Sequence, residues 1–316
     1  MNSLKQALTH YFCDPETGDG LNDIESWLLS GDEVLFPILC DTPILQPQVE
    51  AFLEDELWQI ARAIAEYGAD EDARRWYFSR YGRLSIPEPA PIDSDILGEG
   101  YPGFWDCVGY PDFLHRLKPI PPEDLILQVV EPGFNGGVGL DLGAGQGGMT
   151  QRMAALCEEV IGVELNFYLA ATANHFLPRN EIPIRWFDPG EGHHADALVK
   201  PPVTNAKVIC ADARCLPFRE AGFDWIHLGH ILDLLEEPAE VLAHLRTLMN
   251  PNAWLTICTP WDFSEEGHFD ELLTTLGGDF REVYSLASLP WLRYRHKRRF
   301  LLHEDWIWIG RLGNSG

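Results

Sequence analysis

The segment Gly139–Gly147, which reads G-L-D-L-G-A-G-Q-G, has the residue types and spacing of a ligand-binding turn. Its later glycines follow an apolar stretch, where a strand must turn tightly into a helix and the backbone must approach a ligand. A dinucleotide pyrophosphate requires the spacing G-x-G-x-x-G, whereas these glycines are spaced G-x-G-x-G. Asp141, just before them, would repel a pyrophosphate but suits the ammonium of a methionine group. The pattern favours S-adenosylmethionine, and the expected contacts are Asp141, Gly143, Ala144, Gly145 and Gly147.

Two further acids follow apolar stretches later in the chain. Glu164 ends the run V-I-G-V-E, where one carboxylate can accept hydrogen bonds from both hydroxyls of a ribose. Asp212 follows K-V-I-C-A and is placed to accept from an adenine amino group, with the amide of Ala213 beside the ring. Each acid alone also fits a helix N-cap. Three acids at successive strand ends favour a cofactor site, to which Leu165 and Leu228 are added as predicted contacts.

A second group of polar and aromatic residues follows the next two apolar stretches. The run I-H-L-G-H-I-L-D-L-L places His230 and Asp233 beyond a predicted strand. Histidine titrates near neutral pH, so His230 is the predicted general base, and Asp233 is expected to orient it or a cationic substrate. Trp261 and Asp262 offer an aromatic wall beside a carboxylate, which suits an amine or imidazolium. Structural roles, a histidine bonded in the core and a tryptophan packing a loop, account for the same residues.

Beyond Pro132, stretches typical of strands alternate with helical ones. This alternation predicts an α/β fold with a Rossmann-like, mostly parallel sheet covered on both faces. The predicted strands are 138–142, 160–164, 207–211, 223–228 and 254–259, with a final antiparallel pair at 281–286 and 306–311. The predicted helices are 148–157, 167–176, 238–249 and 265–276.

The chain before this domain divides into two smaller regions. Residues 1–45 contain short apolar runs broken by Gly, Asp and Pro, which predicts a small accessory module poor in strands. Residues 46–131 form a helical linker and lid region. Apolar residues recur at helical spacing from 46 to 81, and a stretch rich in Pro, Gly and aromatics follows at 86–122. Tyr101 and Trp105 are candidates for a lid over the reaction. The third domain spans 132–316.

The composition narrows the classes of partner. Among 316 residues, 23 Lys and Arg face 49 Asp and Glu, and the net charge of -26 disfavours nucleic acid as a bulk partner. The basic run at 293–299 is short and favours a substrate carboxylate or neutralisation of acidic surface. Seven scattered cysteines without a C-x-x-C pair indicate reduced thiols, and neither a signal sequence nor a membrane span is evident, so we expect a cytoplasmic protein. His193 and His194 lack a third ligand, and no metal is expected.

Residues 132–312 resemble a class I S-adenosylmethionine-dependent methyltransferase domain. The likeness is carried by Asp141 to Gly147, Glu164, Asp212-Ala213 and the L-P-F at 216–218. It implies a seven-stranded sheet with a reversed last strand, a cofactor across the strand ends and methyl transfer that leaves S-adenosylhomocysteine. The segments T-P-W-D-F-S-E-E at 259–266, L-G-G at 276–278 and L-P-W-L-R-Y-R-H at 289–296 are similar to a subgroup acting on small molecules, including histidine-like substrates.

The N-terminus resembles the zinc-ribbon module that accompanies some methyltransferases. The likeness is carried by F-C-D-P-E-T-G at 12–18 and F-P-I-L-C-D-T-P-I-L at 36–45. Only Cys13 matches a ligand position of such a ribbon, and Cys40 does not complete a pair. We therefore expect a degenerate module without zinc, held by its own core or by docking on the main domain.

Methyl transfer to nitrogen or oxygen of a small molecule or modified peptide is the leading expectation. Transfer of another group of the same cofactor, such as aminocarboxypropyl, is an alternative, as is a non-catalytic cofactor-binding partner protein. The acceptor and the oligomeric state stay open at this stage.

Overall fold

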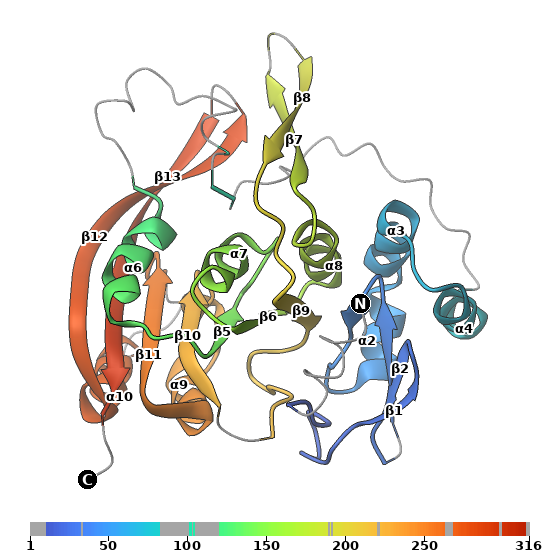
Figure 1. The fold of residues 1–316 in the computed structure, drawn as a ribbon, viewed down its shortest axis with the longest axis horizontal. Helices are drawn as coiled ribbons and strands as arrows, with labels where there is room; N and C mark the ends of the chain where they lie inside the picture. The colour runs from blue at the N-terminus through green and yellow to red at the C-terminus, as the bar shows by residue number, and fades with distance from the viewer. Residues whose placement is uncertain are drawn as a thin grey trace.

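A computed structural model describes residues 11–32, 34–82, 101–102, 104, 120–188, 190, 192–219, 222–262, 268–296 and 299–313. Its largest element is a seven-stranded sheet in the order β12-β13-β11-β10-β5-β6-β9 (Figure 1). Neighbouring strands from β11 to β9 in this order are parallel, while β13 runs antiparallel to both β11 and β12. This arrangement confirms the predicted class of sheet. The strands are β5 (Val138–Leu142), β6 (Glu159–Glu164), β9 (Ala206–Cys210), β10 (Phe223–Gly229), β11 (Met249–Thr259), β12 (Phe280–His296) and β13 (Arg299–Leu312).

Helices cover both faces of this sheet. In Figure 1, α6, α7 and α8 lie on one side and α9 and α10 on the other. Their bounds are α6 (Pro122–Val130), α7 (Gly148–Ala154), α8 (Phe167–Phe176), α9 (Pro238–Leu248) and α10 (His268–Asp279). The Asn166 side chain caps α8 by accepting from the amide of Leu169, and Pro238 begins α9. Helix α6 lies within the region 46–131 that was predicted to be a helical linker and lid, although no individual helix was predicted at 122–130. None of the described helices is long and apolar enough to cross a membrane.

The N-terminal module is a four-stranded antiparallel sheet followed by three helices. Its elements are β1 (Asn22–Glu25), β2 (Leu28–Ser30), β3 (Leu35–Leu39), β4 (Thr42–Pro43), α2 (Val49–Asp55), α3 (Leu57–Tyr67) and α4 (Glu71–Tyr81). The prediction of a strand-poor module was wrong, because two to five residues suffice for each strand when tight turns join them. The three helices agree with the helical spacing predicted from 46 to 81.

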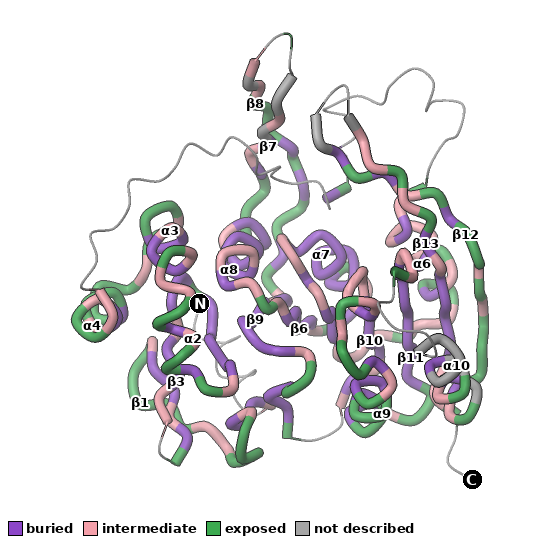
Figure 2. The backbone as a smooth tube through the Cα atoms, turned by 180° about the vertical axis from the view of Figure 1, so that it is seen from behind, coloured by how far each residue is buried: buried purple, intermediate pink, exposed green. Residues whose placement is uncertain are grey.

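The module docks on the edge of the large sheet. Ile44 pairs with Cys210 at the end of β9, and the amide of Leu45 donates to the Cys210 carbonyl at 2.8 Å. On one face, α3 packs against α8. Buried positions run without interruption from the module into the large sheet (Figure 2), and one apolar core includes residues of both. Docking on the main domain is thus part of what holds the module.

Two hairpins rise on the side of the sheet where the parallel strands end. The hairpin of β7 (Glu181–Asp188) and β8 (Gly192–Val199) is an insertion between α8 and β9 that was not predicted. Only residues 306–311 of β13 pair with β11, so 299–305 and their partners in β12 extend past the sheet. A separate apolar cluster joins the two hairpins, and we call it the cap cluster: Tyr101, Phe104, Phe176, Ile182, Ile184, Leu198 and Tyr294. Trp105 lies outside the described residues.

Candidate active site

The glycine loop after β5 fits closely against the neighbouring strand β10. Gly143 has φ +79°, and a Cβ there would lie 2.3 Å from the Ile231 side chain and 3.0 Å from the Gly229 carbonyl. Gly147, at φ +91°, has Ala173 and the Tyr101 hydroxyl at its back. Gly145 has φ +53°, but a Cβ there would meet nothing nearer than 4.0 Å. The first and last glycines are required by packing, and the middle one faces the open space that a cofactor needs.

Asp141 is buried beneath this loop. Its Oδ2 accepts a hydrogen bond of 2.6 Å from the Thr150 hydroxyl on α7. Burial raises the pKa of the Asp141 carboxyl to about 7, although the bond from Thr150 opposes the shift. A carboxylate that is costly to ionise in isolation is stabilised by a cation, so this site suits the ammonium of the cofactor's methionine group.

Glu164 links the end of β6 to the glycine loop. Its carboxylate oxygens accept from the amides of Gly145 and Asn166, both at 2.9 Å. Burial raises the Glu164 pKa against these backbone bonds. A carboxylate offers about four lone pairs, and the Leu165 backbone also bonds to this one, so an acceptor position stays available for a ribose hydroxyl. The adjoining Leu165 is 56% exposed at the strand end, where an adenosine has an apolar surface to contact.

Asp212, at the end of β9, is held by a neighbour. Arg214 donates to it from its guanidinium, with the shortest bond at 2.7 Å, and from its backbone amide. Burial pushes the Asp212 pKa up, but the bonds from Arg214 outweigh it and lower the pKa. Ala213 is half-buried beside it, whereas the Leu228 side chain is fully buried in β10 and belongs to the core. The residues at the ends of β5, β6 and β9 together fit S-adenosylmethionine.

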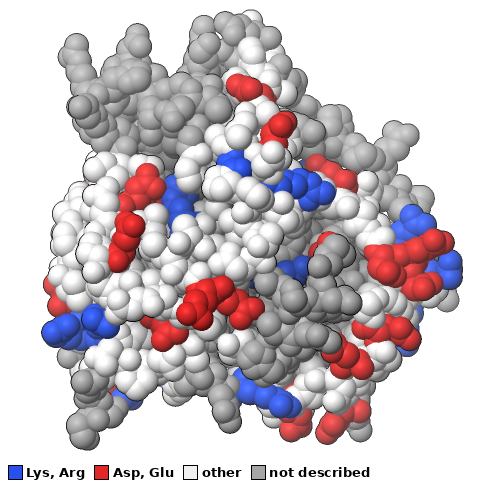
Figure 3. Space-filling model, viewed as in Figure 1, with Lys and Arg blue, Asp and Glu red and all other residues white. Residues whose placement is uncertain are grey.

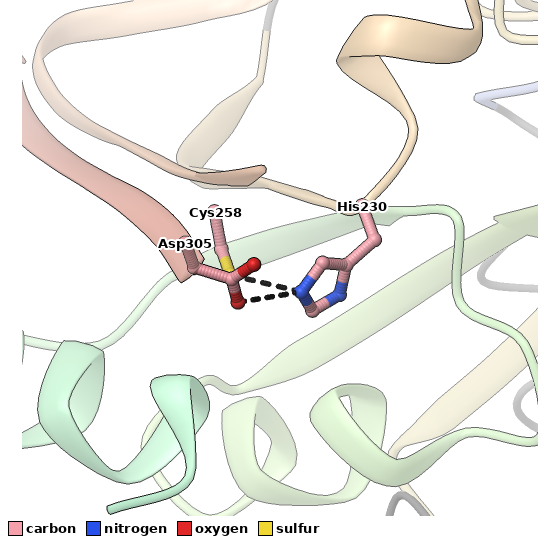
Figure 4. A group of neighbouring side chains, drawn as sticks. All are labelled: His230, Cys258 and Asp305. Atoms are coloured by element: carbon pink, nitrogen blue, oxygen red, sulfur yellow. Dashed lines mark hydrogen bonds and ion pairs between the residues drawn. The ribbon is translucent and has the colours of Figure 1, made fainter. Parts of the chain in front are cut away.

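His230 lies one strand further along the same edge, and Figure 4 shows what it contacts. Its Nε2 is 2.8 Å from Oδ2 of Asp305 on β13 and 3.3 Å from Sγ of Cys258 on β11. The Cys258 thiol is in turn 3.2 Å from the same Asp305 oxygen. Asp305 has 0% exposure, and its Oδ1 has no hydrogen-bond partner within the described part of the chain. The structure thus brings together three residues of which sequence reasoning had singled out one.

The His230 ring is held in place from several directions. Its backbone has φ +55°, and its amide donates to the Cys258 carbonyl at 2.8 Å. Trp291 stacks on the imidazole with ring centroids 4.2 Å apart. His230 immediately follows Gly229, whose carbonyl contacts the glycine loop, so the ring belongs to the edge where the cofactor site lies.

The structure corrects the partner that was predicted for His230. Asp233 instead accepts from the Thr259 hydroxyl at 2.9 Å and from the Asp262 amide at 3.3 Å. It ties the loop after β11 to the loop after β10, because these loops leave adjacent parallel strands. Asp305 takes the predicted role of Asp233.

Trp261 begins the loop after β11 and is half-buried. Its backbone has φ +66°, and its ring packs against Trp306 with centroids 4.5 Å apart. Asp262 beside it is exposed. His227, the other histidine of this segment, is buried in β10 and bonded to Thr256, and burial lowers its pKa to about 3. His227 is therefore a neutral core residue.

Asp305 and Trp291 were not predicted as site residues. The available signal for Asp305 was an acid directly before the apolar run W-I-W-I. Trp291 lies in the segment 289–296, which had been singled out only for its likeness to a subgroup. Neither signal says which distant residue is the partner.

Residues 140–257 match the family model described as a methyltransferase domain, a little more than a third of the chain. No curated protein matches the sequence. Solved structures with a similar fold include the YcgJ protein from Bacillus subtilis (12% identity, TM-score 0.45, covering 62% of this chain and 99% of that one). They also include the N-methyltransferase NodS from Bradyrhizobium japonicum with S-adenosyl-L-homocysteine (14% identity, TM-score 0.43, 68% and 98% covered). A TehB-like S-adenosylmethionine-dependent methyltransferase from Corynebacterium glutamicum has 16% identity and a TM-score of 0.41, with 63% and 92% covered.

Proposed function

We propose that this S-adenosylmethionine-dependent methyltransferase methylates nitrogen or oxygen of a small molecule or modified peptide, with His230 as the general base. The observation that carries the proposal is the 2.8 Å bond between His230 Nε2 and Asp305 Oδ2, next to the glycine loop. The cofactor supplies an electrophilic methyl group on its sulfonium. The protein then has to align the acceptor and remove its proton.

The bond to Asp305 selects the tautomer of the base. A carboxylate beside Nε2 favours the form in which Nε2 carries the hydrogen and donates it to Asp305. Nδ1 then has a free lone pair with which to accept a proton from the substrate. As the imidazole becomes positively charged, Asp305 and the face of Trp291 both stabilise it.

The surroundings of His230 favour a nitrogen acceptor. Trp291 stacks on the base, and Trp261, in the loop after β11, forms a second aromatic pair with Trp306 on β13. The exposed carboxylate of Asp262 adjoins that pair. Aromatic faces beside carboxylates attract cations, so an amine or imidazole substrate is the chemistry that these residues recognise best.

Charge supports a small or peptidic substrate over nucleic acid. The net charge is -26, and on the face shown in Figure 3 the described Lys and Arg side chains occur in small separate groups. A polyanion requires a continuous basic surface. A cytoplasmic location is a further part of the proposal, supported by six described cysteines that are all free.

The experiment starts with calorimetric titration of the purified chain with S-adenosylhomocysteine. Methyl transfer from labelled S-adenosylmethionine to a panel of primary amines, imidazoles and short peptides follows, and the product mass separates methyl from aminocarboxypropyl transfer. We expect His230→Ala to lower kcat by about 10²–10⁴-fold while cofactor affinity stays the same. His244→Ala, on the surface helix α9, is the matched control. Full activity in His230→Ala would refute the assignment of the base.

A further inference from the structure

We propose that His230, Cys258 and Asp305 also form a binding site for a divalent cation of the zinc class. The candidate donor atoms are Nε2, Sγ and Oδ2, and they are separated by 2.8, 3.2 and 3.3 Å. All three atoms point to one place between β10, β11 and β13 (Figure 4). An imidazole, a thiolate and a carboxylate with a fourth position open are a ligand set typical of zinc sites that bind a further molecule.

The geometry requires only a small adjustment. Zinc bond lengths of about 2.0–2.3 Å place tetrahedral donor atoms about 3.4–3.6 Å apart, so the three atoms must separate by a few tenths of an ångström. Cys258 and Asp305 lie on adjacent antiparallel strands, since Cys258 pairs with Ile307 in the ladder. His230 is 24% exposed, so its ring has room to move toward solvent.

An unsatisfied carboxylate oxygen points independently to a cation. Asp305 is completely buried, yet among the residues that the structure describes its Oδ1 has no hydrogen-bond partner. Within the described part of the chain, Asp305 pairs with His230, which carries a positive charge only when it is protonated. A buried carboxylate without a fixed positive charge is energetically costly, and a bound dication would remove that cost.

The thiol selects the kind of cation. Magnesium and calcium prefer oxygen ligands, whereas zinc and similar ions bind thiolate and imidazole. Burial raises the pKa of Cys258 well above its ordinary value, so the group is a thiol in the metal-free protein. On binding, the sulfur–metal bond replaces the S–H bond and Nε2–H gives way to a nitrogen–metal bond. The hydrogen displaced from Nε2 moves to Nδ1, so the imidazole stays neutral. With Asp305 already ionised, the side chains therefore release one proton, that of the thiol.

Metal binding also has a consequence for catalysis, and this part rests on the proposed function. With the metal on Nε2, the neutral imidazole carries its single N–H hydrogen on Nδ1. Nδ1 then donates a hydrogen bond and can no longer accept the substrate proton. The metal-bound form of the enzyme is therefore inactive, and the site acts as a metal-dependent off state of the base.

The test uses the full-length protein, freed of metal with a chelator and titrated with Co²⁺ alone. We expect one equivalent to bind with a sulfur-to-cobalt charge-transfer absorption, which Zn²⁺ then displaces. Cys258→Ser should abolish the absorption, and Asp305→Asn should weaken binding by at least about 100-fold. Cys210→Ser, which alters a buried thiol on β9, should leave the spectrum unchanged. Circular dichroism and S-adenosylhomocysteine affinity establish that each variant is folded.

Absence of a stoichiometric thiolate band, or a band that persists in Cys258→Ser, would overturn the site. Both readouts are independent of methyl transfer. If an acceptor is found, Zn²⁺ should inhibit the reaction reversibly. With inhibition measured against each protein's own metal-free activity, the inhibition constant for Zn²⁺ should be at least about 100-fold higher in Asp305→Asn than in the parent protein. If Co²⁺ binds as expected but Zn²⁺ does not inhibit methyl transfer, the metal site is supported and the assignment of His230 as the base is refuted.

Discussion

The two halves of the large sheet obtain their polar contacts in different ways. The cofactor half consists of strands β5, β6 and β9, and the half of the proposed acceptor site, here called the acceptor half, consists of strands β10, β11 and β13. In the cofactor half, the partners are close in sequence: Asp141 and Thr150 are 9 residues apart, and Glu164 and Gly145 are 19 apart. In the acceptor half, His230 and Asp305 are 75 residues apart. Contiguous motifs therefore build the cofactor site, whereas the proposed acceptor site exists only once the last strands have paired.

The largest effect is expected at Asp305. Asp305→Asn keeps the shape of the side chain but removes the charge that selects the His230 tautomer, and kcat should fall by about 10²–10⁴-fold. Glu304→Gln, at an exposed position of the same strand, should have no such effect. Steady-state kinetics of both variants provide the check. Equal loss in the two would show that the strand rather than the carboxylate matters.

The next effect contrasts two glycines of the cofactor loop. Gly143→Ala should cost about 2–4 kcal/mol of unfolding free energy, because a Cβ at φ +79° collides with Ile231. Gly145→Ala has only the backbone penalty of about 1–2 kcal/mol, but its methyl group enters the open space before the loop. In urea unfolding, we expect the larger loss of stability in Gly143→Ala. In titration with S-adenosylhomocysteine, we expect the larger loss of affinity in Gly145→Ala. Reversal of this order would contradict the packing described here.

A third prediction concerns Asp141 and pH. Its folded pKa of about 7 lies above the ordinary value of about 3.9, so between these values the folded chain keeps a proton that the unfolded chain has lost. Stability from this group is fully present below about pH 4 and is lost as pH rises through 7, by up to a few kcal/mol. Asp141→Asn removes this pH-dependent contribution to stability, because an amide does not titrate in this range.

Urea unfolding at pH 5 and pH 8 measures the difference. The variant should lose less stability than the parent between these pH values, and at pH 8 it should be the more stable of the two. It should also bind S-adenosylmethionine more weakly, since the ammonium loses its carboxylate. Parallel pH dependences in the two proteins would argue against a raised pKa at Asp141.

The smallest effect is expected at Arg214, whose side chain is 53% exposed. Arg214→Ala removes a solvent-screened partner of Asp212, and the unfolding free energy should change by less than about 1 kcal/mol. The released carboxylate becomes free to accept from adenine, so cofactor affinity should be equal or slightly higher. A large loss of affinity in titration calorimetry would mean that Arg214 itself contacts the cofactor.

The difference in sequence separation between the two halves of the sheet also explains which features the sequence predicts. Apolar stretches and turn residues are local signals, and they locate β5 at 138–142 and α8 at 167–176 with the observed bounds. The hairpin β7–β8 was not predicted from the sequence. Asp305 was missed because its pairing with His230 depends on the antiparallel register of β13 on β11, which no local pattern specifies. The same limit concealed the grouping of Cys258 with these two residues.

The tautomer of His230 is the most direct test of the account, because it needs no acceptor. Long-range ¹H–¹⁵N correlation spectra of the metal-free protein, labelled at histidine, identify the ring nitrogen that carries hydrogen. The resonance is assigned by its absence from His230→Ala. We expect the Nε2–H form in the parent protein and loss of that preference in Asp305→Asn. A parent protein with hydrogen on Nδ1 at neutral pH would contradict it.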